Sequence, residues 1–139
     1  MKIISLFGNR NKIRLIDEKG LTVTYEDTPE KNYIKALTRK KINDLRGALL
    51  YCDKIIELDP FFQKSYILKM KIFFELKDYQ SSMFNLLDAV KIDLDKGKDL
   101  SSEIYDTLLN VFEILPKEER DEFIEYFRYF KRLIKNDLI

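Results

Sequence analysis

Residues 42–59 have the sequence INDLRGALLYCDKIIELD, and residues 76–93 have the sequence LKDYQSSMFNLLDAVKID. The two stretches correspond when they are shifted by 34 positions, so that Asp44 matches Asp78 and the small residues Ala48 and Ser82 coincide. Apolar residues recur in both at the three- and four-residue spacing of amphipathic helices. A fixed period of this length, spanning two helices, indicates a helical repeat.

Helix signals on both sides of these stretches extend the pattern to three helix pairs. Thr28 can cap a first helix whose first residue is Pro29, and Pro116 can open the last one. Asp99 or Ser101 can cap the fifth helix. The chain is therefore predicted to be mostly α-helical, with helices near residues 29–40, 43–58, 61–76, 79–93, 100–115 and 116–135.

The first 27 residues have a different pattern. Residues 12–17 and 21–26 alternate between apolar and polar side chains around the turn Glu18-Lys19-Gly20, which predicts a β-hairpin. With residues 3–7 it would form a three-stranded meander. A small sheet is marginal alone, so its apolar face should pack on a helix. We expect one compact protein with a β element over 1–27 and a helical domain over 28–139.

The helical part resembles the tetratricopeptide repeat (TPR) family. The resemblance implies antiparallel helix pairs stacked as a right-handed superhelix, whose first helices line a groove that binds a protein or peptide. Asn32, Arg39 and Leu94 depart from the family pattern, so the repeats are degenerate, and an irregular helical bundle is the alternative. The resembling residues are Ala36, Asp44, Leu45, Ala48 and Ile56 to Pro60 in one copy and Tyr66, Phe73, Leu76 to Tyr79, Ser82, Leu86, Ala89, Ile92 and Asp93 in the next.

Composition excludes several classes of function. The 139 residues contain 25 Lys and Arg against 24 Asp and Glu, a net charge of +1 that argues against a dedicated nucleic-acid binder. There is no histidine, the commonest general base and metal ligand, and Cys52 alone cannot form an intrachain disulfide. The sequence contains no membrane span and no signal peptide pattern. We expect a cytoplasmic protein.

No motif in the sequence predicts catalysis, a cofactor or a metal site. The acidic residues are spread over charged helix faces, and Gly8-Asn9-Arg10-Asn11 is better explained as a turn than as a phosphate loop. Cys52 lies on an apolar stripe, which favours a buried and inert thiol. The predicted function is a non-catalytic scaffold, not an enzyme.

The TPR-like register predicts a partner groove on the first helices of successive pairs. Its lysines and apolar anchors would suit an acidic, partly hydrophobic peptide. The alternative is that Tyr33 and Ile67 are core residues and the N-terminal sheet fills the groove. The basic cluster Arg39, Lys40, Lys41 and Arg46 could bind an anionic partner, or could simply complement a helix dipole. The groove candidates are Tyr33, Leu37, Lys40, Lys64, Ile67, Lys71 and Phe74.

The last helix offers a second candidate interface. Tyr126, Tyr129 and Leu133 widen its apolar stripe beyond one face, so its outer side could contact a partner, a second copy in a homodimer, or the N-terminal sheet.

A component of a transcription regulator is the alternative function. Residues 1–8 and the hairpin resemble the opening of bacterial activators that join a winged-helix domain to helical repeats. No helix-turn-helix segment fits between the hairpin and the repeats, which argues against DNA binding by this chain alone.

Overall fold

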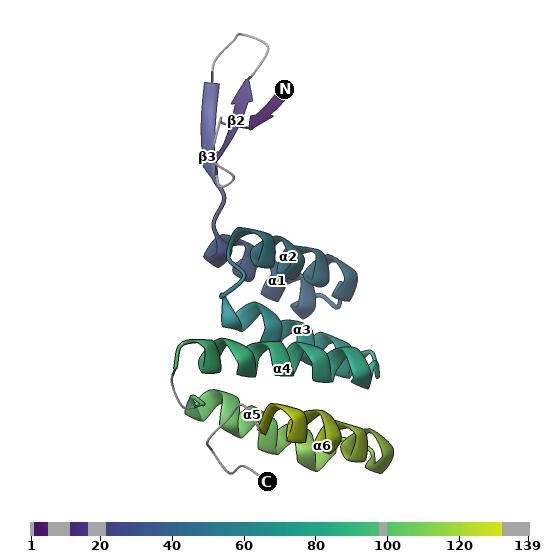
Figure 1. Cartoon of the computed structure of the whole chain (residues 1–139). Coiled ribbons are helices and arrows are strands. Elements are labelled where there is room, and N and C mark those ends of the chain that lie inside the picture. The colour runs from purple at the N-terminus through teal and green to yellow at the C-terminus, as the bar shows by residue number, and fades with distance from the viewer. Residues whose placement is uncertain (1, 6–11, 17–21, 98–99, 132–139) are drawn as a thin grey trace. The chain divides into compact units, whose positions relative to one another are not determined.

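A computed structural model describes residues 2–5, 12–16, 22–97 and 100–131 of the chain (Figure 1). The described part is mostly helical, with six helices packed in pairs. The chain divides into two compact units, Met1–Ser65 and Tyr66–Ile139, which are described separately below. The helices are α1 (Pro29–Lys41), α2 (Leu45–Leu58), α3 (Gln63–Glu75), α4 (Tyr79–Asp95), α5 (Ser102–Ile114) and α6 (Lys117–Lys131).

The N-terminal segment contains three short strands, β1 (Lys2–Ser5), β2 (Lys12–Ile16) and β3 (Thr22–Glu26). The backbone pairs β1 with β2 and β2 with β3, both antiparallel, and Leu15 stands opposite both Ile3 and Val23. The connecting residues and, except at Glu26, the side chains of the strands lie outside the described part. The packing of an apolar sheet face on a helix therefore stays a prediction.

The first two helix pairs have the same turn geometry, although their turn sequences differ. Asn43 and Lys77 stand 34 positions apart, and both adopt the left-handed conformation, with φ of 65° and 60°. The next residue caps the following helix in each case: Asp44 accepts a hydrogen bond from the Gly47 amide, and Asp78 accepts one from the Ser81 amide. The 34-residue correspondence in the sequence is thus also a correspondence in backbone conformation.

Side chains at equivalent positions also mark where the paired helices cross. Ser82 on α4 is buried and donates its hydroxyl to the backbone oxygen of Met70 on α3 at 2.9 Å, which requires a close approach of the two helices. Ala48 on α2 matches Ser82, and Ala36 on α1 matches Met70, and both alanines are fully buried. Ser82 therefore occupies a tight helix crossing, as the sequence predicts, and the complete burial of Ala48 agrees with a crossing at the equivalent position of the first pair.

The third helix pair uses a different turn. Ser101 caps α5 by accepting from the Ile104 amide. After α5 the backbone at Leu115 is extended, and Pro116 precedes α6, so no left-handed residue is used. The connection between α5 and α6 therefore consists of Leu115 and Pro116 alone.

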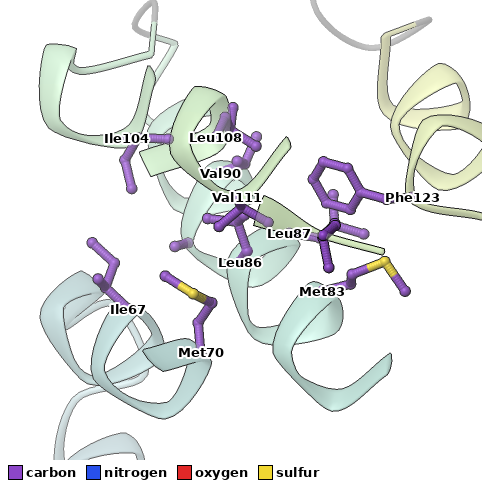
Figure 2. Packing of buried hydrophobic residues seen from close by; sticks show 12 residues of the cluster. Ile67, Met70, Met83, Leu86, Leu87, Val90, Ile104, Leu108, Val111 and Phe123 are labelled. Carbon is purple, nitrogen blue, oxygen red and sulfur yellow. The ribbon is translucent and has the colours of Figure 1, made fainter. Parts of the chain in front are cut away.

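The core of the second unit lies between α3, α4, α5 and α6 (Figure 2). Phe123 of α6 is fully buried in it and packs edge-on against Phe112 of α5, with 5.2 Å between ring centroids. Leu86 and Val90 of α4 stand at its centre with no exposed surface. The apolar residues of these helices are thus buried largely against one another within this unit.

Candidate functional site

The best candidate site in the first unit is built around the ring of Tyr33 on α1. Phe62, in the segment before α3, packs edge-on against it, with ring centroids 5.9 Å apart. The ammonium of Lys64 lies 5.9 Å from the centroid of the same ring, within the range of a cation–π contact. Three side chains from α1, the connecting segment and the start of α3 are thereby held together.

Two more predicted residues extend this site along α1. Leu37 and Lys40 follow Tyr33 by four and seven positions, so all three lie on one helix face. Leu37 remains 42% exposed, and Lys40 is half-buried. We call this set, Tyr33, Leu37, Lys40, Phe62 and Lys64, the Tyr33 surface.

Ile67 is a core residue, and its assignment to a partner groove is wrong. Only 5% of its surface is exposed, and it belongs to the same apolar cluster as Met70 and Leu86 (Figure 2). A binding partner could contact the Ile67 side chain only if the second unit opened. The alternative reading of Ile67 as core is correct for this residue.

The other two groove candidates in the second unit have different environments. Lys71 on α3 is exposed. Phe74 is half-buried and packs edge-on against Tyr79 at the start of α4, with centroids 5.2 Å apart. Phe74 therefore closes the corner between α3 and α4. A role in binding stays a prediction for both residues.

The aromatic last helix is partly accounted for. Tyr126 of α6 is half-buried and packs edge-on against Phe84 of α4 at 5.3 Å, while Phe84 remains 44% exposed. The side chain of Tyr129 and the whole of Leu133 lie outside the described residues. Of the predicted second interface, the described part therefore contains only Tyr126, which forms an aromatic pair with Phe84 at the surface.

The basic cluster at the end of α1 has a structural explanation. Arg39, Lys40 and Lys41 occupy its last turn, where cations stabilise the helix dipole. Arg39 also pairs with the capping carboxylate of Asp44 at 3.5 Å. Such an exposed pair contributes little by itself.

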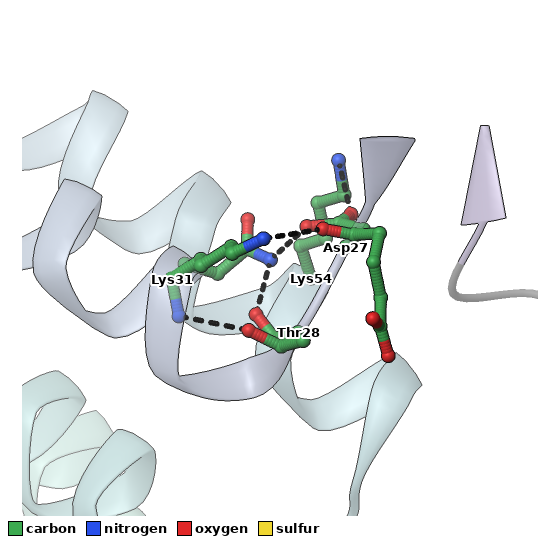
Figure 3. Close-up of polar contacts among 6 residues, drawn as sticks. Asp27, Thr28, Lys31 and Lys54 are labelled. Atoms are coloured by element: carbon green, nitrogen blue, oxygen red, sulfur yellow. Dashed lines mark hydrogen bonds and ion pairs between the residues drawn. The ribbon is translucent and has the colours of Figure 1, made fainter. Parts of the chain in front are cut away.

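A buried polar network fixes the start of α1 (Figure 3). Asp27 forms an ion pair with Lys54 of α2 at 2.9 Å and accepts a hydrogen bond from the Asn32 amide, which also donates to the Thr28 carbonyl at 2.8 Å. Burial by itself would raise the pKa of Asp27. The hydrogen bonds from Lys54 and Asn32, with the charges of Lys54 and Lys35, outweigh burial and lower that pKa below its usual value.

This network explains why Asn32 departs from the repeat pattern. A large apolar residue is expected at position 32, but the amide there is fully buried and supplies two donors to the segment that enters α1. All these contacts are internal. The network therefore ties the segment that enters α1 to helix α2 through Lys54.

No metal-binding cluster of three or more Cys, Asp or Glu side chains occurs in the described ranges. Cys52 is fully buried, as its apolar stripe predicts. Within residues 22–97 and 100–131, no helix is long and apolar enough to cross a membrane.

Sequence reasoning missed two aromatic residues of these surfaces, Phe62 and Phe84. A signal for Phe62 was available, because Phe61 and Phe62 directly follow Pro60 in a connecting segment. Phe61 is 60% exposed there. Phe84 stands on a helix with apolar residues on most sides, and nothing in the sequence marks it as the exposed one.

Comparison with known proteins gives no relative: no protein-family model matches the chain, and no curated protein is significantly similar to it.

Proposed function

We propose that the chain is a non-catalytic interaction module that binds an acidic, partly apolar segment of a protein partner at the Tyr33 surface. The observation that carries this proposal is the cluster of Lys64 and Phe62 on the ring of Tyr33, beside the exposed Leu37. Aromatic anchors held by their neighbours lose little conformational freedom on binding, which makes them effective contact residues.

Charge supports the choice of an acidic segment. Lys40 and Lys64 both belong to the Tyr33 surface. With a net charge of only +1, the whole protein provides little general attraction for anions. Binding would then depend on these local lysines, and it would weaken as salt screens them.

The TPR-like resemblance supports the same role. Repeats of that family are normally scaffolds for protein or peptide partners, and the shared turn geometry at positions 43 and 77 agrees with a repeated helix pair. The TPR assignment and the groove it implies remain part of this proposal.

A peptide-display selection against the folded chain tests the proposal. We expect enrichment of peptides that combine Asp or Glu with large apolar residues. Lys64→Glu should weaken their binding by about tenfold at low salt, since one favourable charge contact becomes repulsive. Lys117→Glu, at an exposed position on α6, is the matched control and should leave binding unchanged.

A Tyr33→Ala variant tests the apolar part of the site. It should weaken the same peptides even at high salt, because the aromatic contact does not depend on charge. Enrichment of peptides without acidic residues, or equal binding by the wild type, Lys64→Glu and Tyr33→Ala with all three folded, would refute the proposal.

A further inference from the structure

Helix α1 carries a second exposed face, distinct from the Tyr33 surface. Lys31, Ile34, Thr38 and Lys41 follow one another at steps of three, four and three residues, so they form one stripe along the helix. All four are exposed, and Ile34 is 63% exposed. We call these four residues the α1 stripe; it presents an aliphatic side chain between two lysines.

Helix α5 carries a stripe with the same spacing and the opposite charge. Glu103, Asp106, Asn110 and Glu113 follow at steps of three, four and three residues, and all four are exposed. Ile114, beside Asn110 on the helix surface, is 62% exposed. We call the four residues the α5 stripe.

The two helices are also complementary as a whole. Helix α1 contains five basic residues and one acidic residue, whereas α5 contains three acidic residues and no basic one. The end charges of each stripe stand ten positions apart, or about 15 Å along a helix. In an antiparallel arrangement, Lys31 can therefore meet Glu113 while Lys41 meets Glu103.

The charges on the stripes are available for a partner. Lys41, Asp106 and Glu113 form no ion pair with any other described residue. Lys31 donates one hydrogen bond to the Glu26 backbone oxygen at 3.1 Å, and an ammonium has two further donors. Antiparallel docking also sets opposite helix dipoles side by side.

We infer that the partner of the α1 stripe is the α5 stripe of a second copy of this chain. In this register Ile34 would face Asn110 between the two pairs of opposite charges, and Ile114 would lie about one turn away, beyond Glu113. The contact joins two different surfaces, so it is heterologous: each copy that uses its α1 stripe still presents its α5 stripe. It is also weak, because exposed ion pairs contribute little individually.

This inference shares no residue with the Tyr33 surface and does not rest on the proposed function. Sedimentation equilibrium of the full chain over a concentration series tests it. At about 50 mM salt, the average mass should rise above 16.7 kDa with concentration, and at about 500 mM salt it should return towards that value.

A charge exchange identifies the surfaces. The double variants Lys31→Glu/Lys41→Glu and Glu103→Lys/Glu113→Lys should each lose self-association. A mixture of the two should associate again, because the unchanged α1 stripe of one variant can bind the unchanged α5 stripe of the other, and the two reversed stripes also have opposite charges. Lys117→Glu serves as the control and should behave like the wild type. If circular dichroism shows that a reversed variant has lost helix, glutamine at the same positions replaces it, with loss of association as the readout.

Several outcomes would overturn the inference. One is a wild-type mass that stays at the monomer value across the concentration series at low salt. Another is a mixture of the reversed variants that remains monomeric although both are folded. Retained self-association in the folded double glutamine variants would place the contact elsewhere on the chain.

Discussion

Lys77 adopts a conformation that lysine ordinarily avoids. Lys77 lies in the turn between α3 and α4 and has a φ of 60°, in the left-handed region. Asn43, the equivalent residue of the first pair, tolerates left-handed backbone better because its short polar side chain can form local hydrogen bonds. We expect Lys77→Gly to stabilise the fold by about 0.5–1 kcal/mol, since relief of strain exceeds the added chain entropy of glycine. Asn43→Gly should increase the free energy of unfolding by a smaller amount. Urea unfolding measures both, and destabilisation by Lys77→Gly would contradict the turn geometry.

Asp27 couples stability to acid. Its pKa is lower in the folded protein than in the unfolded chain, so its ionised form stabilises the fold fully above the ordinary pKa of an aspartate side chain. That contribution disappears as the pH falls through the lowered folded-state pKa. The wild type should therefore exceed Asp27→Asn in unfolding free energy near neutral pH, and the gap should narrow in acid. A gap independent of pH would exclude this role.

Asn32 supports the same network without titrating. Asn32→Ala removes both donors and leaves buried acceptors on Asp27 and Thr28 without them, which should cost about 1–3 kcal/mol. Chemical unfolding at neutral pH measures this cost. Lys91→Ala, at an exposed position on α4, is the control and should change stability by less than about 0.5 kcal/mol.

Helix pairing depends on the small residues at the crossings. Ala48 has no exposed surface, so Ala48→Leu should overpack the crossing of α1 with α2 and destabilise the protein by about 1–3 kcal/mol. Leu50→Ala, on the same helix but 71% exposed, is the matched control and should have a small effect. Equal unfolding midpoints for the wild type and Ala48→Leu would show that the crossing is placed wrongly.

The helices were predictable from the sequence because their signals are local. Thr28 and Pro29 mark the start of α1, whereas the second helix, predicted from residue 43, begins at Leu45 after its cap Asp44. The third helix begins at Gln63 instead of 61, because the Phe61 amide bonds the Asp59 carboxylate in a turn before it. A local hydrogen bond of this kind moves the start of the helix by two residues, but the segment remains a helix.

The site was less predictable, because it depends on contacts between elements. Helical periodicity places Tyr33, Leu37 and Lys40 on one face, but it cannot show that Lys64 lies over the Tyr33 ring. The same periodicity gave Ile67 a place in the groove, whereas packing with Leu86 and other residues of α4 and α5 buries it. Which apolar residues stay exposed is decided by neighbours that are distant in sequence.

For the whole molecule, the main question is how far self-association continues. A contact between α1 and α5 of successive copies does not close on itself unless the geometry forms a ring. Oligomers larger than the dimer should therefore appear as concentration increases. Adding the Lys31→Glu/Lys41→Glu variant to the wild type should shorten them, because that variant can occupy only one end. Sedimentation velocity would resolve this change, and an assembly that stops at the dimer would indicate a symmetric contact.

The single thiol offers a way to time the opening of the first unit. Cys52 is the sole cysteine in the sequence and is fully buried on α2, so a thiol reagent can reach it only when its surroundings part. Its labelling rate would then report the population of that opened state. Ala48→Leu should accelerate the reaction, and Lys77→Gly should slow it only if the opening also involves the second unit. The labelling rate of Cys52 would thus distinguish partial from global unfolding.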